Sequence, residues 1–201
     1  MKRQQSKVFC IGLSKTGTTS LTAAFKMLGY RAAHFPLRMV RYTNGVLSFR
    51  RSVVAQYNML SDLPVARFYR DLDVSFPDSR FILTTRQIDD WLESCCRHVW
   101  PGQFTAADTW FNRLHRDVYG VIDYDENQFR EAYRGHIDNV YSYFTGREND
   151  LIEFNVTAGD SWATLCSFLG VEVPDEPFPK KDCLYSQFFK LVPLQRLRGG
   201  D

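Results

Sequence analysis

The segment that most constrains the fold is a short apolar run that passes through a glycine-rich loop into a helix. Residues 8–13 (VFCIGL) are almost continuously apolar, which is typical of a strand buried on both faces of a parallel sheet. After the loop, Leu21, Phe25 and Leu28 recur at helical spacing and Gly29 ends the pattern. A strand, a glycine loop and a helix in this order predict a phosphate-binding loop over residues 12–21 (GLSKTGTTSL).

The composition of this loop fits an anionic ligand. Glycine permits a tight turn in which successive backbone N–H groups point inward, and the following helix N-terminus adds partial positive charge. Lysine adds a full charge, and hydroxyl groups add further donors. The residues that we expect to contact the anion are Ser14, Lys15, Thr16, Gly17, Thr18, Thr19 and Ser20.

The spacing differs from that of a nucleotide triphosphatase. The pattern GxxxxGK[ST] requires lysine after the second glycine, but Thr18 follows Gly17 and the one lysine, Lys15, lies inside the loop. The strand predicted at residues 80–85 continues into Arg86 and not into a metal-binding aspartate. Both differences argue against Mg²⁺ and a triphosphate, and we expect no metal site. A sulfuryl group in transfer carries less negative charge than a phosphoryl group, so lysine and backbone amides can suffice.

The remaining pattern alternates strands and helices. Further strands are expected at residues 30–35, 80–85 and 150–155, and helices after each of them. We predict an α/β fold of three layers (α/β/α) with a central parallel sheet, like that of P-loop nucleotide hydrolases. A helical insertion, with helices near residues 106–119 and 126–144, would separate the third and fourth strands. We expect one domain over residues 1–201, with a closing helix in its last twenty residues.

Composition excludes several classes of protein. A formal net charge of +2 on 201 residues is too small to indicate nucleic-acid binding. The five cysteines form no CxxC pair, which disfavours a zinc site and a disulfide framework. No apolar window is long enough to span a bilayer. We expect a soluble, cytoplasmic protein, and its oligomeric state stays open.

Two segments resemble a known family. KTGTTSL is similar to the 5′-phosphosulfate loop of the P-loop sulfotransferases, which use 3′-phosphoadenosine 5′-phosphosulfate (PAPS), and RFILTTRQIDDWLES is similar to their second signature. In that signature an arginine at a strand end and a serine eight residues later bind the 3′-phosphate, which implies Arg86 and Ser94 here. Lys180 and Lys181 resemble a basic loop that closes over the product, adenosine 3′,5′-bisphosphate (PAP). The resemblance extends from about residue 7 to residue 180.

Three residues are candidates for the general base. Relatives of the heparan-sulfate type carry a glutamate before a His-Phe-Phe run, but Ala32 and Ala33 stand before His34 here. Asp62, before a predicted helix, is the favoured base, although it is equally suited to be a helix N-cap. His34 at the end of the second strand is the next candidate. His98 follows Ser94, and we expect it on the surface.

The sequence thus predicts metal-independent, in-line transfer of a sulfuryl group from PAPS to a hydroxyl or amine, with Lys15 at the leaving oxygen. The acceptor is expected to be a small molecule or a glycan. Aromatic residues are expected either to line its pocket or to pack in the core: Trp100, Phe104, Trp110, Phe111, Tyr119 and Tyr124. A catalytically silent nucleotide-binding protein and a P-loop small-molecule kinase are the alternatives.

Overall fold

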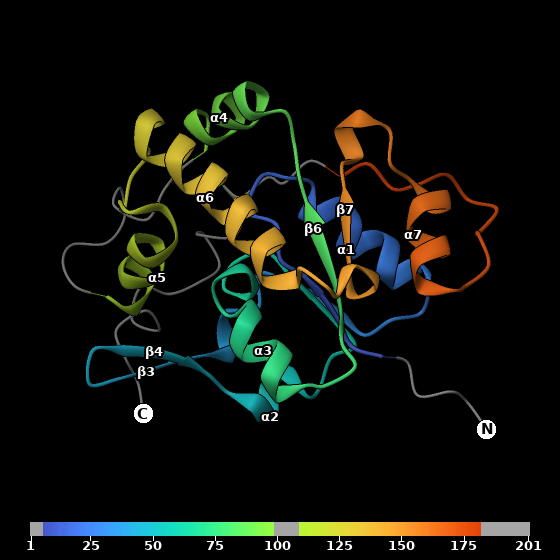
Figure 1. Ribbon diagram of the computed structural model, residues 1–201, viewed down its shortest axis with the longest axis horizontal. Coiled ribbons are helices and arrows are strands. Elements are labelled where there is room, and N and C mark those ends of the chain that lie inside the picture. The colour runs from blue at the N-terminus through green and yellow to red at the C-terminus, as the bar shows by residue number, and fades with distance from the viewer. Residues whose placement is uncertain (1–5, 99–108, 182–201) are drawn as a thin grey trace.

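A five-stranded parallel sheet forms the centre of the protein. The computed structural model describes residues 6–98 and 109–181 (Figure 1). The strands lie in the order β2-β5-β1-β6-β7, and every neighbouring pair is parallel. Their bounds are β1 Val8–Cys10, β2 Ala32–His34, β5 Met59–Ser61, β6 Arg80–Thr84 and β7 Leu151–Phe154.

Helices connect these strands and cover both faces of the sheet. They are α1 Thr18–Met27, α2 Arg51–Val54, α3 Tyr69–Ser75, α4 Ile88–Cys96, α5 Trp110–Tyr119, α6 Glu126–Phe144 and α7 Trp162–Leu169. Short 3₁₀ turns lie at η1 Leu37–Met39, η2 Val65–Arg67, η4 Glu148–Asp150 and η5 Val156–Ala158. A separate antiparallel hairpin joins β3 Val40–Thr43 to β4 Val46–Phe49. No helix in the described ranges is both long and apolar enough to cross a membrane.

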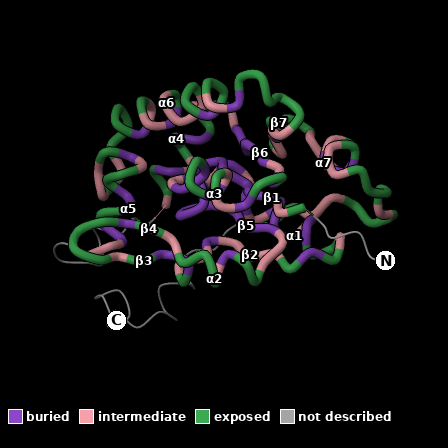
Figure 2. Tube along the Cα trace, turned by 60° about the horizontal axis from the view of Figure 1, so that its bottom comes forward, coloured by how far each residue is buried: buried purple, intermediate pink, exposed green. Residues whose placement is uncertain are grey.

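The two faces of the sheet carry two separate hydrophobic cores. Val8 and Cys10 of β1 pack with α1 and α7, whereas Phe9 and Ile11 pack with α3, α4, α5 and α6. Successive side chains of a strand point to opposite faces, so a fully apolar β1 requires helices on both sides. In Figure 2 the central strands are buried while the outer sides of the helices are exposed.

This architecture confirms the predicted three-layer α/β/α fold with a parallel sheet. The helical insertion also occurs as expected, because α4, α5 and α6 lie between β6 and β7. These two strands are the fourth and fifth of the sheet, not the third and fourth, because the sequence pattern does not reveal β5. In β5 only Met59 and Leu60 are apolar, a run too short to indicate a strand, and its pairing with both β1 and β2 defines it as one.

Two further local differences have clear causes. Asp62 is not the N-cap of a helix: the 3₁₀ turn η2 comes first, and α3 begins at Tyr69. The hairpin β3–β4 was also not predicted, although Asn44 and Gly45 at its tip have φ of 51° and 77°. Asn-Gly between apolar runs is the strongest short signal for such a turn. The closing helix expected in the last twenty residues lies outside the described part of the chain.

Glycines at two places in this fold should respond in opposite ways to substitution by alanine. A Cβ on Gly12 would lie 1.9 Å from Thr84 Oγ1 and 2.4 Å from the Thr84 carbonyl oxygen. Gly12→Ala should therefore lower the free energy of unfolding by about 3 kcal/mol or more. Gly135 lies within α6, and a Cβ added there would meet no atom within 4 Å. Gly135→Ala should raise that free energy by about 0.5–1 kcal/mol, because alanine has the higher helix propensity.

Denaturant unfolding followed by tryptophan fluorescence measures both changes. A Gly12→Ala protein as stable as the wild type would contradict the close approach of the loop to β6.

Candidate active site

The phosphate loop leaves β1 and enters α1 at the carboxyl edge of the sheet. Gly12 lies directly against Thr84 of β6, which leaves no room for a side chain. Lys15 and Gly17 have φ of 73° and 98°, in the left-handed region. Such a conformation, alternating with right-handed residues, turns backbone N–H groups toward one point. The N-terminus of α1, which starts at Thr18, faces the same loop.

Several side chains of the loop hold the loop itself. Thr16 Oγ1 donates to the Leu13 carbonyl oxygen at 2.6 Å and lies 2.6 Å from Thr84 Oγ1. Trp91 Nε1 of α4 donates to the Ser14 carbonyl oxygen at 2.8 Å. Thr16 and Ser14 are both buried. Their hydroxyls are thus used within the protein, and they shape the anion site more than they contact its ligand.

Asp62 is the central anchor of this loop. It follows β5 with φ of 70°, and its side chain is fully buried. Asp62 Oδ1 accepts hydrogen bonds from Ser14 Oγ at 2.5 Å and from the Leu63 backbone N–H at 2.7 Å. Asp62 Oδ2 accepts one from Thr18 Oγ1 at 3.0 Å and lies 2.9 Å from His34 Nε2. One carboxylate therefore connects both ends of the loop to β2 and β5.

These contacts determine the protonation state of Asp62. Burial on its own would raise the pKa of the carboxyl group. The charge and hydrogen bond of His34, with the hydrogen bonds from Ser14 and the Leu63 N–H, outweigh burial and lower this pKa to about 2. Asp62 is therefore ionised at neutral pH and a weak base. Asp62 alone therefore fits poorly as the general base that the sequence analysis favoured.

His34, the second candidate base, forms a pair with Asp62. His34 Nε2 lies 3.1 Å from Thr18 Oγ1 and 3.3 Å from Thr19 Oγ1, in addition to its contact with Asp62. Its side chain is 20% exposed, whereas that of Asp62 is 1% exposed. A neutral imidazole whose Nε2–H donates to Asp62 has Nδ1 as its basic nitrogen. The pair can therefore accept a proton on the histidine and stabilise the resulting cation with the aspartate.

His98 is not the surface residue that we expected. It is half-buried just after α4. Burial, and then the positive charge of Lys15, lower the pKa of His98 to about 4. The charge of Lys15 also acts on the Cys95 thiol. These effects place the Lys15 ammonium group, Cys95 and His98 in one electrostatic neighbourhood at the loop.

Arg86 lies at the carboxyl end of β6, as the sequence indicates. Its backbone is clamped by Tyr133, whose hydroxyl accepts from the Arg86 N–H at 2.9 Å and donates to the Arg86 carbonyl oxygen at 2.6 Å. Arg86 Nε is buried and has no hydrogen-bond partner within residues 6–98 and 109–181. The alternative for Arg86, an ion pair with Asp89 or Asp90 on the surface, does not occur in the described ranges, and Asp89 pairs with Arg130 at 2.9 Å instead. A buried guanidinium nitrogen without a partner fits a phosphate ligand.

The other predicted contacts lie around the same edge. Ser94 is half-buried in α4, two turns beyond Arg86. The Lys181 backbone N–H donates to Ser20 Oγ at 2.9 Å, so the segment with Lys180 and Lys181 runs beside the first turn of α1. Both lysine side chains are exposed. The structure thus brings Lys15, Asp62, His34 and this segment together at the loop, with Arg86 at the end of a neighbouring strand.

Most of the aromatic block packs in the core. Phe111 and Tyr119 are buried, and Trp110 and Tyr124 are half-buried against the same cluster. The rings of Tyr119 and Phe129 stack with centroids 4.5 Å apart. These contacts favour the packing role over an open acceptor pocket for the four residues. Trp100 and Phe104 lie outside the described residues.

An aspartate does follow a strand beside the phosphate loop, which corrects one reason for expecting no metal there. β1 has two neighbours: β6 continues into Arg86, as the sequence indicates, but β5 is followed by Asp62. The oxygens of Asp62 are occupied by Ser14, Thr18, Leu63 and His34. No group of three or more His, Cys, Asp or Glu side chains in the described ranges could hold a metal ion.

One comparison with known proteins identifies the family of this chain. The sequence profile of a protein family described as "Sulfotransferase domain" matches residues 7–183. A curated relative from Aspergillus versicolor, named "Ava biosynthesis cluster protein M", is 25% identical over 208 residues, covering 86% of this chain and 79% of the relative. Among solved structures, a gluconokinase from Sinorhizobium meliloti 1021 aligns at 15% identity, 73% of this chain, 99% of that one and a TM-score of 0.33. A TM-score of that size supports no inference about function.

The role of Asp62 predicts a pH-dependent loss of stability on substitution. Because its pKa is about 2 in the folded protein and about 3.9 in an unfolded chain, ionised Asp62 stabilises the fold above about pH 4. That contribution, on the order of 2 kcal/mol, is lost as the pH falls toward 2. Asp62→Asn should therefore be less stable than the wild type at pH 7, and the difference should shrink between pH 4 and pH 2.

Denaturant unfolding at a series of pH values measures this difference. Asp175→Asn, at an exposed carboxylate, is the matched control and should differ little from the wild type at any pH. A constant difference for Asp62→Asn from pH 7 to pH 2 would contradict the assignment.

Proposed function

This chain belongs to the family of sulfotransferase domains, and from this premise we propose that it transfers a sulfuryl group from PAPS to an acceptor hydroxyl or amine without a metal. The observation that carries the proposal is Arg86, whose buried Nε has no hydrogen-bond partner among the described residues. It follows the strand next to the phosphate loop, where it can hold the 3′-phosphate that distinguishes PAPS from other adenosine nucleotides. Ser94 would add a hydroxyl to the same phosphate.

The phosphate loop supports the other half of the donor site. Its backbone N–H groups and the N-terminus of α1 would hold the 5′-phosphosulfate, and Asp62 keeps the loop in this shape. When bound, PAPS supplies an activated sulfuryl group whose leaving group is a phosphate. Lys15 has no ion pair within the described ranges, so its ammonium group is available to stabilise negative charge on the leaving oxygen. The segment containing Lys180 and Lys181 would cover the adenosine side.

We assign proton removal from the acceptor to His34, with Asp62 as the residue that positions it. His34 is the more exposed partner of the pair, and its Nδ1 is basic while Nε2–H donates to Asp62. Asp62 would stabilise the protonated imidazole because it stays ionised. This assignment replaces Asp62 as the base and keeps both residues in the reaction.

The kinase alternative fits the site less well. A P-loop kinase needs lysine after the second glycine and an aspartate that is free to reach the metal. Here Thr18 stands at the lysine position and donates to Asp62, and each oxygen of Asp62 accepts from groups of the protein. A catalytically silent nucleotide-binding protein stays an alternative, and measurements of sulfuryl transfer distinguish it from an enzyme. For the acceptor we propose a small molecule, because the Aspergillus versicolor relative is named for a biosynthesis cluster.

Calorimetric titration tests the donor assignment. Adenosine 3′,5′-bisphosphate should bind at least about tenfold more tightly than ATP with Mg²⁺, which corresponds to about 1.4 kcal/mol. Lys15→Ala should weaken bisphosphate binding by roughly 10- to 150-fold, because a charge-assisted hydrogen bond contributes roughly 1.5–3 kcal/mol. Lys26→Ala, at an exposed lysine in the last turn of α1, is the matched control and should bind like the wild type. Tight ATP–Mg²⁺ binding without bisphosphate binding would refute the proposal.

Transfer of ³⁵S from labelled PAPS into the small-molecule fraction of a cell extract tests the base. His34→Ala should lower the transfer rate by about 100-fold or more, in the range for a lost general base. Its affinity for the bisphosphate should change by less than about tenfold. His98→Ala is the comparison and should retain most of the rate. The assignment of His34 as the base would be wrong if both variants lost the transfer rate equally. It would also be wrong if His34→Ala changed only the affinity for the bisphosphate.

A further inference from the structure

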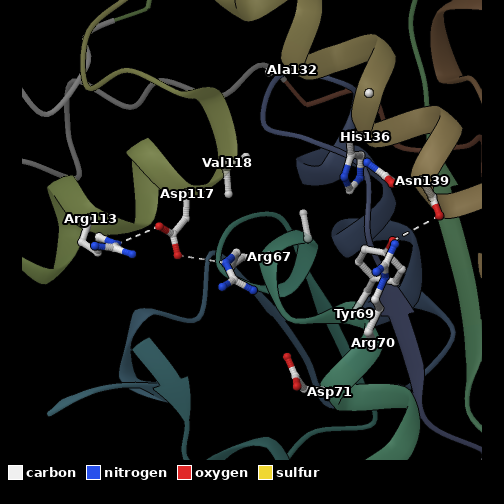
Figure 3. Close-up of a pocket in the computed structure, with 12 residues that line it drawn as sticks. Arg67, Tyr69, Arg70, Asp71, Arg113, Asp117, Val118, Ala132, His136 and Asn139 are labelled. Carbon is white, nitrogen blue, oxygen red and sulfur yellow. Dashed lines mark hydrogen bonds and ion pairs between the residues drawn. The ribbon is translucent and has the colours of Figure 1, made fainter. Parts of the chain in front are cut away.

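A cavity lies away from the phosphate loop, between η2, α3, α5 and α6. It has a volume of about 680 Å³ (Figure 3), which is within the size range of small-molecule sites. None of the loop residues 12–21, nor Arg86 or Ser94, lines it. The cavity is therefore separate from the proposed donor site, and its properties do not depend on the proposed function.

Two arginines in the wall of this cavity share one carboxylate. Arg67 Nε donates to Asp117 Oδ2 at 3.1 Å, and Arg113 Nε donates to Asp117 Oδ1 at 2.7 Å. Figure 3 shows Asp117 between the two guanidinium groups. Each arginine is held through its Nε, and its two terminal nitrogens have no hydrogen bond to a residue in the described part of the chain. Asp117 therefore orients both guanidinium groups and leaves their terminal nitrogens available.

A third arginine is held by aromatic rings. Arg70 Nε donates to Tyr69 Oη at 3.0 Å. Its guanidinium carbon lies 5.5 Å from the ring centroid of Tyr69 and 5.4 Å from that of Tyr143. No carboxylate within the described ranges forms an ion pair with Arg70. The two rings orient the guanidinium and do not neutralise its charge.

The charges in the wall favour an anion. Three arginines face two aspartates, and Asp117 is already paired with two of the arginines. The planar group of a single arginine matches carboxylate geometry, and Arg70 is the arginine of this wall without a carboxylate partner in the described part of the chain. The remaining carboxylate, Asp71, and the side chain of Asn139 can accept hydrogen bonds, which suits a ligand that also carries hydroxyl groups.

The inner wall is polar and fixed. His136 Nε2 lies 2.7 Å from the Ile11 carbonyl oxygen. A carbonyl only accepts, so this nitrogen carries the proton and the ring orientation is set. The Tyr69 hydroxyl donates to the Asn139 carbonyl oxygen at 3.3 Å. Rigid polar walls of this kind lower the entropic cost of binding a small polar molecule.

We propose that this cavity binds a small hydroxylated carboxylate, such as a sugar acid or a hydroxy acid. The carboxylate binds to the terminal nitrogens of Arg70, which no carboxylate in the described part of the chain neutralises, and the hydroxyl groups bind to Asp71 and Asn139. The site is distinct from the site for the sulfuryl donor.

The probe for the test is D-glucuronate, and D-glucose, which lacks the carboxylate, is the matched ligand control. Calorimetric titration of the wild type should show glucuronate binding at least about tenfold tighter than glucose, a difference of about 1.4 kcal/mol. The double variant Arg70→Gln/Arg113→Gln should lose this preference. Both positions are exposed or form only surface pairs, so the variant should stay folded, which circular dichroism checks.

Two further variants show where the probe binds. Arg41→Gln, at an exposed arginine of the β3–β4 hairpin, should bind glucuronate like the wild type, and so should Lys15→Ala. If Lys15→Ala loses glucuronate binding and the double variant keeps it, glucuronate binds at the phosphate loop. That result would overturn the proposal. Equal binding of glucose and glucuronate by the wild type would overturn it as well. Because bisphosphate binding is measured separately, neither result bears on the donor assignment.

Discussion

The buried carboxylate of Asp62 is the interaction on which the rest of this site depends. It accepts hydrogen bonds from Ser14 near the start of the phosphate loop and from Thr18 at its end. A loop of glycine and small hydroxylated residues has many accessible conformations, and fixing each residue costs about 1–2 kcal/mol in entropy. The hydrogen bonds that Asp62 accepts at both ends of the loop offset part of that cost. The loop therefore has a fixed shape in the protein without a ligand.

The architecture explains why the functional groups gather at one edge. All five strands of the sheet are parallel, so the residues that follow them meet at the same end. In the register of the sheet, Ser61 of β5 lies beside His34 of β2 on one side and beside Cys10 of β1 on the other. Asp62, the next residue, therefore lies beside both the end of β2 and the start of the loop. Arg86 follows β6 on the opposite side of β1, so the two predicted phosphate subsites lie at the ends of neighbouring strands.

The elements that could be predicted from the sequence are those that a local pattern of apolar residues and glycines determines. The strand, loop and helix over residues 8–28 are adjacent in the chain, and apolar spacing with glycine placement is enough to identify them. The position of Arg86 after a strand was recognisable for the same reason. The strand β5 was not recognisable, because its apolar run is only Met59 and Leu60 and its pairing with β1 and β2 is what makes it a strand.

The pairing of His34 with Asp62 is a consequence of that missing strand. Both residues were identified as candidates from their chemistry, but as alternatives. Their contact depends on the register between β2 and β5, which no local pattern encodes. For the same reason the half-buried state of His98 and the cavity beside Arg67, Arg70 and Arg113 could not be predicted. These features arise where separate helices and turns pack together, and the sequence alone does not fix how helices pack.

The central claim is that one site holds the 5′-phosphosulfate in the loop and the 3′-phosphate at Arg86. It is tested most directly by comparing the binding of adenosine 3′,5′-bisphosphate and adenosine 5′-monophosphate to the wild type and to Arg86→Ala. The account predicts that the wild type prefers the bisphosphate by at least about tenfold, or about 1.4 kcal/mol, and that Arg86→Ala binds the two nucleotides about equally. A preference for the bisphosphate that survives in Arg86→Ala, or no preference in the wild type, would contradict it.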